Sequence, residues 1–341
     1  MAGAALASAT PVGVTIVVFV VATAVALLTS AVLVSRLERV GARFDLSEAA
    51  LGLLAALAAN GPEITSAVTA VLRGQRQIGA GVVFGSNVFN LAALLGLGAL
   101  VAGRIALHRR VVALAGTTAL WLAVVALGTV GSQSSPAIWL LAALLVFVPY
   151  VILSVSPGAR RAAPLPPAAR QWLEGAVTEE ESELFAAVHP RRGTPADALV
   201  ALAALVVVLA SSVVMEHAAS SVGHRFTVPD IVVGAVILAA VTSLPNAVAA
   251  VYLARRGRAV AVLSEALNSN NLNVVVGLLV PAAILGLGHP GPATTVTAGF
   301  AAAMTAGALI LAHARRGLGR AHGAALVAGY LAFVAVVAAI G

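Results

Sequence analysis

The segment NGPEITSAVTAVLRGQRQIGAGVVFGSNVFN, residues 60–90, decides the fold of this 341-residue chain because the chain carries a second copy of it. A shift of 183 residues aligns 62–90 with 245–273 without a gap, and eight of the 29 positions are identical. An excess of alanine and valine explains the shared Ala-Val pair, but not the match of Pro62 with Pro245 or of Asn87 with Asn270. The two segments are therefore interpreted as an internal repeat.

The composition around this repeat is typical of a membrane protein. Hydrophobic residues make up 60% of the chain and charged residues 10%, and the mean hydropathy is +1.02. Soluble domains are about 45–50% apolar and about 25% charged, so the lipid bilayer is the expected partner. Runs long enough to cross it predict ten transmembrane helices, at 11–35, 47–72, 77–103, 111–131, 136–155, 197–218, 230–254, 259–287, 292–313 and 322–340.

The charged residues indicate topology. All 20 basic residues are arginines in short loops, so the net charge of +7 predicts no nucleic-acid partner. The loops on one side hold 17 arginines and those on the other side hold 3. By the positive-inside rule we expect a multi-pass cell-membrane protein, with both termini outside and the 156–195 linker in the cytoplasm. No basic residue precedes the first apolar run, which predicts an uncleaved first helix.

The repeat and the topology together predict two inverted halves. Five spans separate the two copies, and this odd number makes them enter the membrane from opposite sides. We expect an all-α integral membrane protein, with five-helix repeats at 1–155 and 196–341 joined by the linker. Its repeat motifs cover 46–101 and 229–285. Inverted repeats with interrupted helices are typical of secondary transporters, which bind their substrate near mid-membrane.

A proline interrupts one predicted span in each half. Pro62 and Pro245 lack an N–H and clash with the carbonyl four residues back, which frees the carbonyls of Ala58 and Val241. Glu63 follows the first break, and a carboxylate at mid-membrane costs at least about 2.5 kcal/mol. We expect this carboxylate to face the bundle interior and to bind a cation.

Oxygen-bearing side chains accompany both breaks and recur in the next span. Hard cations such as Ca²⁺ and Na⁺ prefer oxygen ligands, which asparagine amides can also supply. In each half the two asparagines of the next span are three residues apart and share a helix face. The oxygen donors near the breaks are Asn60, Glu63, Thr65, Ser66, Thr242, Ser243 and Asn246, and those of the next spans include Ser86, Asn87, Asn90, Ser269, Asn270 and Asn273.

These paired segments resemble the α-repeats of the calcium/cation antiporter superfamily, which includes sodium/calcium and proton/calcium exchangers. The family pattern is a Gly-Thr-Ser-Leu-Pro-Glu break followed by Gly-Ser-Asn-x-x-Asn. The chain has Gly61-Pro62-Glu63 with Gly85-Ser86-Asn87 in the first copy, and Thr242-Ser243-Leu244-Pro245-Asn246 with Ser269-Asn270 in the second. Carried over by position, the resemblance implies an ion site of Glu63, Asn87, Thr242, Ser243, Asn246 and Asn270.

The two copies depart from the family pattern at several positions. The first has Ala59-Asn60-Gly61 in place of Thr-Ser-Leu, and the second has Asn268 in place of the glycine. Asn246 stands where the family has a second acidic residue. Exchangers of this family typically hold Ca²⁺ between two opposed carboxylates, so Glu63 alone leaves a divalent ion undercompensated.

Glu265 is the candidate for the missing charge, because a lipid-facing helix would not keep a carboxylate. On an ideal helix it lies about 40° from Ser269 and about 140° from Asn270. We therefore expect it to border the site. The full set of predicted metal-binding residues is Glu63, Asn87, Asn246, Asn270, Thr242, Ser243, Ser86, Ser269, Asn60 and Glu265.

Structural interpretations compete with these assignments. Glu63 can pair with nearby asparagines to hold two helices together, and Glu265 can hydrogen-bond the same asparagines. Asn60 and Asn246 can be polar residues of a helix break. Polar residues also lie near the end of the sixth span, namely Glu216, His217 and His224. We expect them to be solvated at the surface rather than to form a proton relay. Asp230 is expected to cap a helix, and the acidic cluster 174–183 to form a solvated helix without the pattern of a calcium loop.

The chain contains no His-Glu-x-x-His, Gly-x-Ser-x-Gly or phosphate-loop motif and no cysteine. We expect a transporter that is not an enzyme and needs no cofactor. The leading hypothesis is a secondary active antiporter that exchanges Ca²⁺ or a related cation for Na⁺ or H⁺ by alternating access. The alternatives are a monovalent cation/proton exchanger that has lost Ca²⁺ transport, and a non-transporting membrane scaffold or sensor. The sequence leaves the oligomeric state open.

Overall fold

The fold is almost entirely helical, as the apolar runs predict. The computed structural model describes residues 11–44, 56–187, 193–255, 259–288, 290–315 and 317–341. Its first half contains α2 (Val12–Arg43), α4 (Gly61–Leu72), α5 (Arg76–Asn90), the π-helical segment η1 (Leu91–Leu97), α6 (Gly98–Ala102), strand β1 (Arg104–Ala106), α7 (Arg109–Gly131) and α8 (Pro136–Val155). The linker forms α9 (Pro157–Ala162) and α10 (Pro167–Ala187).

The second half follows a similar order of elements. It contains α11 (Pro195–Arg225), α12 (Asp230–Val232), η2 (Val233–Leu238), α13 (Ala239–Thr242), α14 (Leu244–Arg255), α15 (Ala259–Leu272), η3 (Asn273–Leu279), α16 (Val280–Leu285), α17 (Pro292–Arg315), strand β2 (Gly317–Gly319) and α18 (Arg320–Ile340). Segments η1 and η3 begin directly after Asn90 and Asn273, so both copies of the repeat leave regular α-helix at the same place.

Eight helices among the described residues are long and apolar enough to cross a membrane. The two other predicted spans, 47–72 and 230–254, contain the predicted breaks. One break lies at Asn60, before α4, and the other at Ser243, between α13 and α14. Pro62 and Pro245 each stand in the first turn of the new helix, where a missing N–H costs nothing. Residues 47–55 of the first broken span lie outside the described residues, so the count of ten remains a prediction.

Helix α11 is 31 residues or about 46 Å long. It makes an ion pair near each of its two ends. At its beginning Asp197 Oδ1 lies 2.5 Å from Arg36 Nη1. Near its end Glu216 Oε2 lies 3.0 Å from Arg73 Nη1. The loops that the sequence assigns to opposite sides of the membrane are thus separated along this helix. We call the side of the molecule that holds the Arg73–Glu216 pair and the turn between α4 and α5 the α4–α5 face.

Two features differ from the predicted all-α fold with a solvated acidic helix in the linker. Strands β1 and β2 pair antiparallel, with Ile105 opposite Leu318, so the fold is not wholly helical. Helix α10 is not simply solvated, because it buries Leu173, Ala176 and Val177. It packs on α7, where Glu179 Oε1 lies 3.8 Å from Arg110 Nη1. The side chains of the later glutamates in the acidic cluster lie outside the described residues.

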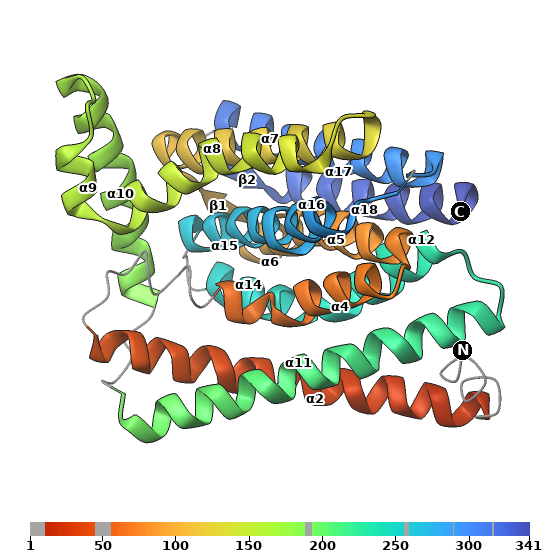
Figure 1. Cartoon of the computed structure of the whole chain (residues 1–341). Helices are drawn as coiled ribbons and strands as arrows, with labels where there is room; N and C mark the ends of the chain where they lie inside the picture. The colour runs from red at the N-terminus through yellow and green to blue at the C-terminus, as the bar shows by residue number, and fades with distance from the viewer. Residues whose placement is uncertain (1–10, 45–55, 188–192, 256–258, 289, 316) are drawn as a thin grey trace.

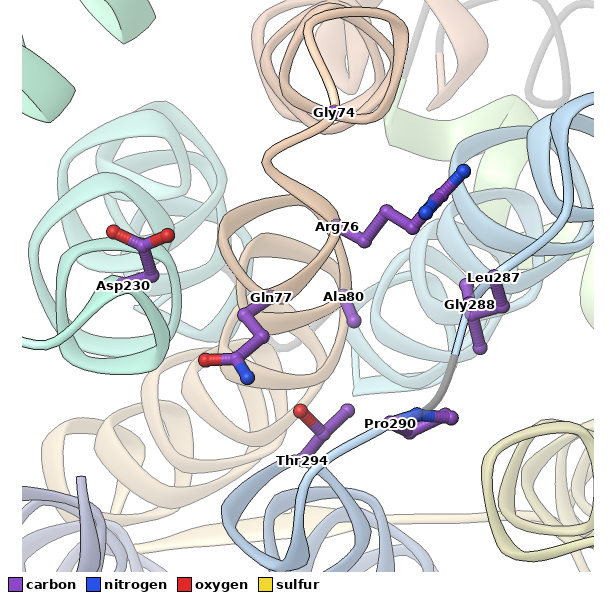
Figure 2. Close-up of a pocket in the computed structure, with 9 residues that line it drawn as sticks. All are labelled: Gly74, Arg76, Gln77, Ala80, Asp230, Leu287, Gly288, Pro290 and Thr294. Carbon is purple, nitrogen blue, oxygen red and sulfur yellow. The ribbon is translucent and has the colours of Figure 1, made fainter.

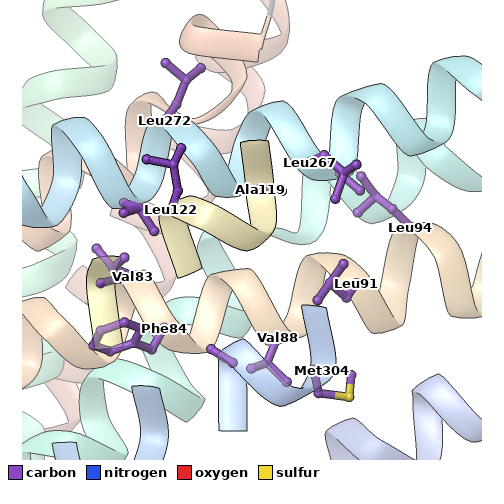
Figure 3. Packing of buried hydrophobic residues seen from close by; sticks show 14 of the residues in the cluster. Val83, Phe84, Val88, Leu91, Leu94, Ala119, Leu122, Leu267, Leu272 and Met304 are labelled. Carbon is purple, nitrogen blue, oxygen red and sulfur yellow. The ribbon is translucent and has the colours of Figure 1, made fainter. Parts of the chain in front are cut away.

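The helices that carry the asparagine motifs form the centre of the fold (Figure 1). In the most apolar window of Arg76–Ala102, 94% of the residues are buried, compared with 22% in Val12–Arg43. Figure 3 shows the packing around this central helix, in which Val83, Phe84, Val88, Leu91 and Leu94 lie among side chains of α7, α15 and α17. The main apolar core therefore positions α5 and η1 firmly.

Glycines bring α5 against the first half of the second broken helix. A Cβ added at Gly81 would lie 2.9 Å from the backbone nitrogen of Ala235, and one at Gly85 would overlap the Ala235 carbonyl. A Cβ at Gly234 would likewise overlap the Ile78 carbonyl. Small residues four apart allow this close backbone approach in membrane helices. The contact fixes the distance between the asparagine motif of one repeat and the break of the other.

Replacement of Gly85 by alanine tests this packing. The added methyl group meets backbone atoms, so Gly85→Ala should lower the free energy of unfolding in detergent by about 1–3 kcal/mol, although alanine favours helix. Gly307→Ala in α17 is the matched control, because a Cβ there has no heavy atom within 4 Å. We expect this control to be neutral or slightly stabilising in the same thermal or denaturant unfolding assay. Equal stability of the two variants would contradict the close approach.

Candidate functional site

The two helix breaks meet around the carboxylate of Glu63. Glu63 is 1% exposed, and its Oε1 accepts hydrogen bonds from Ser243 Oγ at 3.1 Å and Asn246 Nδ2 at 3.4 Å. The same amide nitrogen of Asn246 also donates to Asn60 Oδ1 at 3.3 Å. The structure thus brings together four predicted site residues that lie up to 186 positions apart in the sequence.

The asparagines of the two repeats form a second buried cluster. Asn87 Nδ2 donates to the backbone carbonyl of Asn270 at 3.4 Å, and Asn270 Nδ2 donates to the backbone carbonyl of Asn87 at 3.1 Å. Asn90 Nδ2 donates to Asn270 Oδ1 at 3.1 Å, and Asn273 Nδ2 donates to Asn87 Oδ1 at 3.4 Å. Each bond is matched by a second bond between positions shifted by 183 residues. The cluster therefore has a local twofold relation.

Six buried oxygen atoms near these two clusters have no hydrogen-bond partner within the described part of the chain. A buried polar atom without a partner costs about 1–3 kcal/mol, so a group of them is typical of a site that binds something. Oxygen atoms are the ligands that Na⁺ and Ca²⁺ prefer. The six are Glu63 Oε2, Asn90 Oδ1, Asn273 Oδ1 and the hydroxyls of Ser66, Ser86 and Ser269.

This pattern changes the roles expected of the asparagines. The side-chain oxygens of Asn87 and Asn270 accept hydrogen bonds from the protein, whereas those of Asn90 and Asn273 are open. Asn90 and Asn273 are thus the better candidates for amide ligands, although the predicted site omitted them. Their spacing of three residues from Asn87 and Asn270 is the sequence signal that pointed to them.

The carbonyl freed by Pro62 has a protein partner that the sequence did not indicate. Ser30 Oγ of α2 donates to the Ala58 carbonyl at 3.2 Å, and both residues are buried. One of the two carbonyls freed by the prolines therefore ties α2 to the first break. A long-range contact of this kind leaves no local sequence pattern.

Thr242 and Glu265 belong neither to the hydrogen bonds around Glu63 nor to the asparagine cluster or the six open oxygens. Thr242 is buried, and its hydroxyl donates to the carbonyl of Leu238 at 2.9 Å within its own helix. Glu265 is half-buried and makes no described hydrogen bond or ion pair, so its suggested role stays a prediction. Within the described residues, no group of three His, Asp or Glu side chains could hold a metal ion. Glu63 is accordingly the one carboxylate of the two described clusters.

The solvated surface role expected for Glu216 is wrong. This residue is 0% exposed, and its Oε2 pairs with Arg73 Nη1 at 3.0 Å. The sequence placed it at the end of a span, but helix α11 continues to Arg225. His217 and His224 are exposed as expected, with His224 Nε2 lying 4.0 Å from Asp230 Oδ1. Asp230 is the first residue of α12 and Pro229 is its N-cap residue, so the capping role expected of Asp230 is wrong.

A cavity of about 270 Å³ at the α4–α5 face is separate from the Glu63 cluster (Figure 2). Arg76, Gln77, Asp230 and Thr294 supply its polar walls, and none of the predicted metal-binding residues lines it. The beginnings of α5, α12 and α17 surround it. The predicted cation ligands therefore lie apart from this surface cavity.

Both halves of the chain are similar to known proteins. The family described as "Sodium/calcium exchanger protein" matches the chain twice, at 14–156 and at 197–339. The human sodium/potassium/calcium exchanger 4 is 34% identical over 70 residues, which are 20% of this chain and 11% of that protein. The inner membrane protein YrbG of Escherichia coli strain K12 is 28% identical over 229 residues, 65% of each protein. The matched part thus spans less than two thirds of each relative.

Solved structures share the fold over nearly the whole chain. The sodium-calcium exchanger NCX_Mj has a TM-score of 0.63 at 19% identity, covering 95% of this chain and 99% of that one. The H⁺/Ca²⁺ exchanger CAX has a TM-score of 0.69 at 15% identity, covering 96% and 85%. The likeness to these structures shows the fold, and the two family matches cover most of the chain. The chain is an integral membrane protein that belongs to the sodium/calcium exchanger family.

Proposed function

We propose that this protein is a secondary active cation antiporter with Glu63 as the central ligand of the transported ion. The observation that carries the proposal is the buried carboxylate, which joins the two helix breaks and keeps Oε2 open. An ionised group this deep in a membrane protein is stabilised by a counter-ion or by protonation. A cation or a proton at Glu63 supplies that balance.

The remaining ligands of the proposed site come from both repeats. The proposed neutral ligands are the open oxygens of Asn90 and Asn273 and the hydroxyls of Ser66, Ser86, Ser243 and Ser269. Ca²⁺ takes about 6–8 oxygen ligands, and this set can supply that number. The names of the related exchangers support Ca²⁺ as the exported ion and Na⁺ or H⁺ as the driving ion.

The proposed transport mechanism is alternating access within two inverted five-helix repeats, 1–155 and 196–341. The reciprocal asparagine bonds support equivalent roles for the two halves. The excess of arginine in one set of loops supports an orientation with the 156–195 linker in the cytoplasm and both termini outside. The open oxygens described above favour transport over a scaffold, which would have no use for unpartnered buried ligands.

Loss of the Glu63 charge tests the function directly. At about 4 Å and an effective dielectric of about 20, one unit charge contributes about 4 kcal/mol to the binding of a monovalent cation. We expect Glu63→Gln to weaken cation binding at least about a hundredfold and to abolish Na⁺- or H⁺-driven Ca²⁺ flux in reconstituted vesicles. Glu174→Gln on the exposed face of α10 is the charge-matched control and should keep wild-type flux.

Flux that survives in Glu63→Gln would show that this carboxylate is not the central ligand. An absence of gradient-dependent flux with any cation, in the wild-type protein, would instead favour the scaffold or sensor alternative. Glu265→Gln belongs in the same experiment. A partial loss of Ca²⁺ flux would support a bordering charge, and unchanged flux would make Glu265 a structural residue.

A second candidate function is monovalent cation exchange without Ca²⁺. It is favoured by Asn246, the position that matches Glu63 after the 183-residue shift. Its amide nitrogen donates to Glu63, so a neutral donor stands opposite the carboxylate. One negative charge balances Na⁺ or H⁺ fully and Ca²⁺ only by half.

Restoration of a second carboxylate separates the two candidates. Asn246→Asp keeps the size of the side chain and adds a charge beside Glu63, so it should raise the binding of Ca²⁺ relative to Na⁺ by at least about tenfold. Asn268→Asp is the matched control, because Asn268 lies outside the asparagine cluster and accepts a bond from Tyr150. Ion competition in vesicles measures both. The monovalent candidate is rejected if the wild-type protein already prefers Ca²⁺ and Asn246→Asp does not change that preference.

A further inference from the structure

Helices α2 and α11 form a layer of their own. They pack along each other at one side of the molecule (Figure 1) and share a small apolar cluster, while Ala22 of α2 and Met215 and Ala219 of α11 belong to the main core. The small cluster consists of Leu33, Ala58, Ala201, Ala204 and Val208.

Polar contacts tie α11 to the α4–α5 turn at one end of this layer. Arg73 Nη1 lies 3.0 Å from Glu216 Oε2, and the Glu216 side chain is fully buried. Gln75 Nε2 reaches Ser220 Oγ and lies 3.2 Å from His224 Nε2. The contacts concentrate at the α4–α5 face, where they join the layer to the helix that carries Glu63.

Below the ion pair, α4 and α11 run side by side toward the cation site. A Cβ added at Gly61 would lie 3.2 Å from Val208 Cγ1, which marks one level of their contact. At about 1.5 Å per residue, Ser66 lies about 7.5 Å and Ser212 about 6 Å further along. Both serines thus occupy the same level, between Glu63 and the ion pair. Ser66 lies seven residues, or about two turns, before Arg73 and so shares the side of α4 from which Arg73 reaches Glu216. We call the part of the α4–α11 contact at the level of Ser66, Ser212 and Glu216 the α4–α11 seam.

The seam is polar but incompletely satisfied. The hydroxyls of Ser66 and Ser212 and the Oε1 of Glu216 are buried and have no hydrogen-bond partner within the described residues. On α11, residues 208, 212 and 216 recur at four-residue spacing and share one side of the helix. Buried polar atoms of this kind can bind water or a cation when either enters the seam.

The ion pair closes this row at its outer end. The Arg73 guanidinium places a positive charge and a bulky side chain where a cation would enter the seam. A buried pair is held firmly while both partners are present, and removal of one partner leaves the other charge uncompensated. The contact is therefore expected to be either fully formed or broken, and not partly open.

We propose that the Arg73–Glu216 ion pair is a gate that closes the α4–α11 seam between the α4–α5 face and the cation site at Glu63. The proposal rests on the proposed transport function, because it assigns the seam to the path of the cation. When the gate opens, Arg73 separates from Glu216, and water reaches Ser212 and Ser66. Arg73 and Glu216 are positioning residues and do not bind the transported ion at Glu63.

The absence of cysteine from the chain makes the gate directly measurable. A single Ser212→Cys substitution is nearly isosteric and places a thiol in the seam. Its rate of reaction with a charged, water-soluble maleimide in the detergent-purified full chain reports access of water to the seam. We expect slow labelling with the ion pair intact, and labelling at least about tenfold faster when Arg73→Gln or Glu216→Gln is added.

Further variants separate gating from general loosening. Arg73→Gln with Glu216→Gln should label no faster than the faster single variant, because both remove one contact. Arg36→Gln is the matched control: it removes the pair with Asp197 between α2 and α11, away from the seam, and should leave labelling unchanged. Thr129→Cys, buried in α7, should stay protected in every background.

The gate is overturned if Ser212→Cys labels within twofold of its original rate in both charge variants. It is also overturned if Thr129→Cys becomes equally reactive, since the variants then loosen the whole chain. The labelling needs no transport, so its failure can be told from failure of the proposed function. That function is tested separately by the effect of Glu63→Gln on flux.

Discussion

The burial of one carboxylate, Glu63, is the constraint on which the rest of the structure depends. A charge in this position needs partners from outside its own helix, and Ser243 and Asn246 supply them from the other half of the chain. Ser243 lies at the break between α13 and α14, and Asn246 lies in the first turn after it. The two halves are thus joined through the polar group that would be most costly to bury alone.

Close backbone packing gives these polar contacts their precision. Gly81, Gly85 and Gly234 let α5 approach η2 more closely than any side chain would allow. The π-helical segments η1 and η3 follow both asparagine motifs, and such segments are frequent at functional sites. The asparagine motifs thus lie on helices of the main apolar core, while part of the contact between α2 and α11 is a separate small cluster.

Much of this arrangement could be predicted from sequence because it depends on local patterns. The prolines predicted both breaks, the repeat predicted that Glu63 and Asn246 are equivalent, and the hydropathy predicted the long helices. The contacts of Ser30 with Ala58 and of Arg73 with Glu216 could not be predicted, since each joins distant segments by a single side chain. The β1–β2 pair escaped prediction because three-residue strands have no detectable alternation. Asn90 and Asn273 were visible in the sequence, but only the hydrogen bonds show that their oxygens are open.

The reciprocal asparagine bonds have a consequence for how a duplicated chain can diverge. Asn87 and Asn270 each donate to the other's backbone and accept from the other repeat, so a change at one position removes support from its twin. These sites cannot drift independently after duplication. The contact between Glu63 and Asn246 runs in one direction only, from amide to carboxylate. A change at position 246 removes donors to Glu63 and Asn60 but none of the reciprocal asparagine bonds, so the two halves can differ at this pair of positions without loss of that cluster.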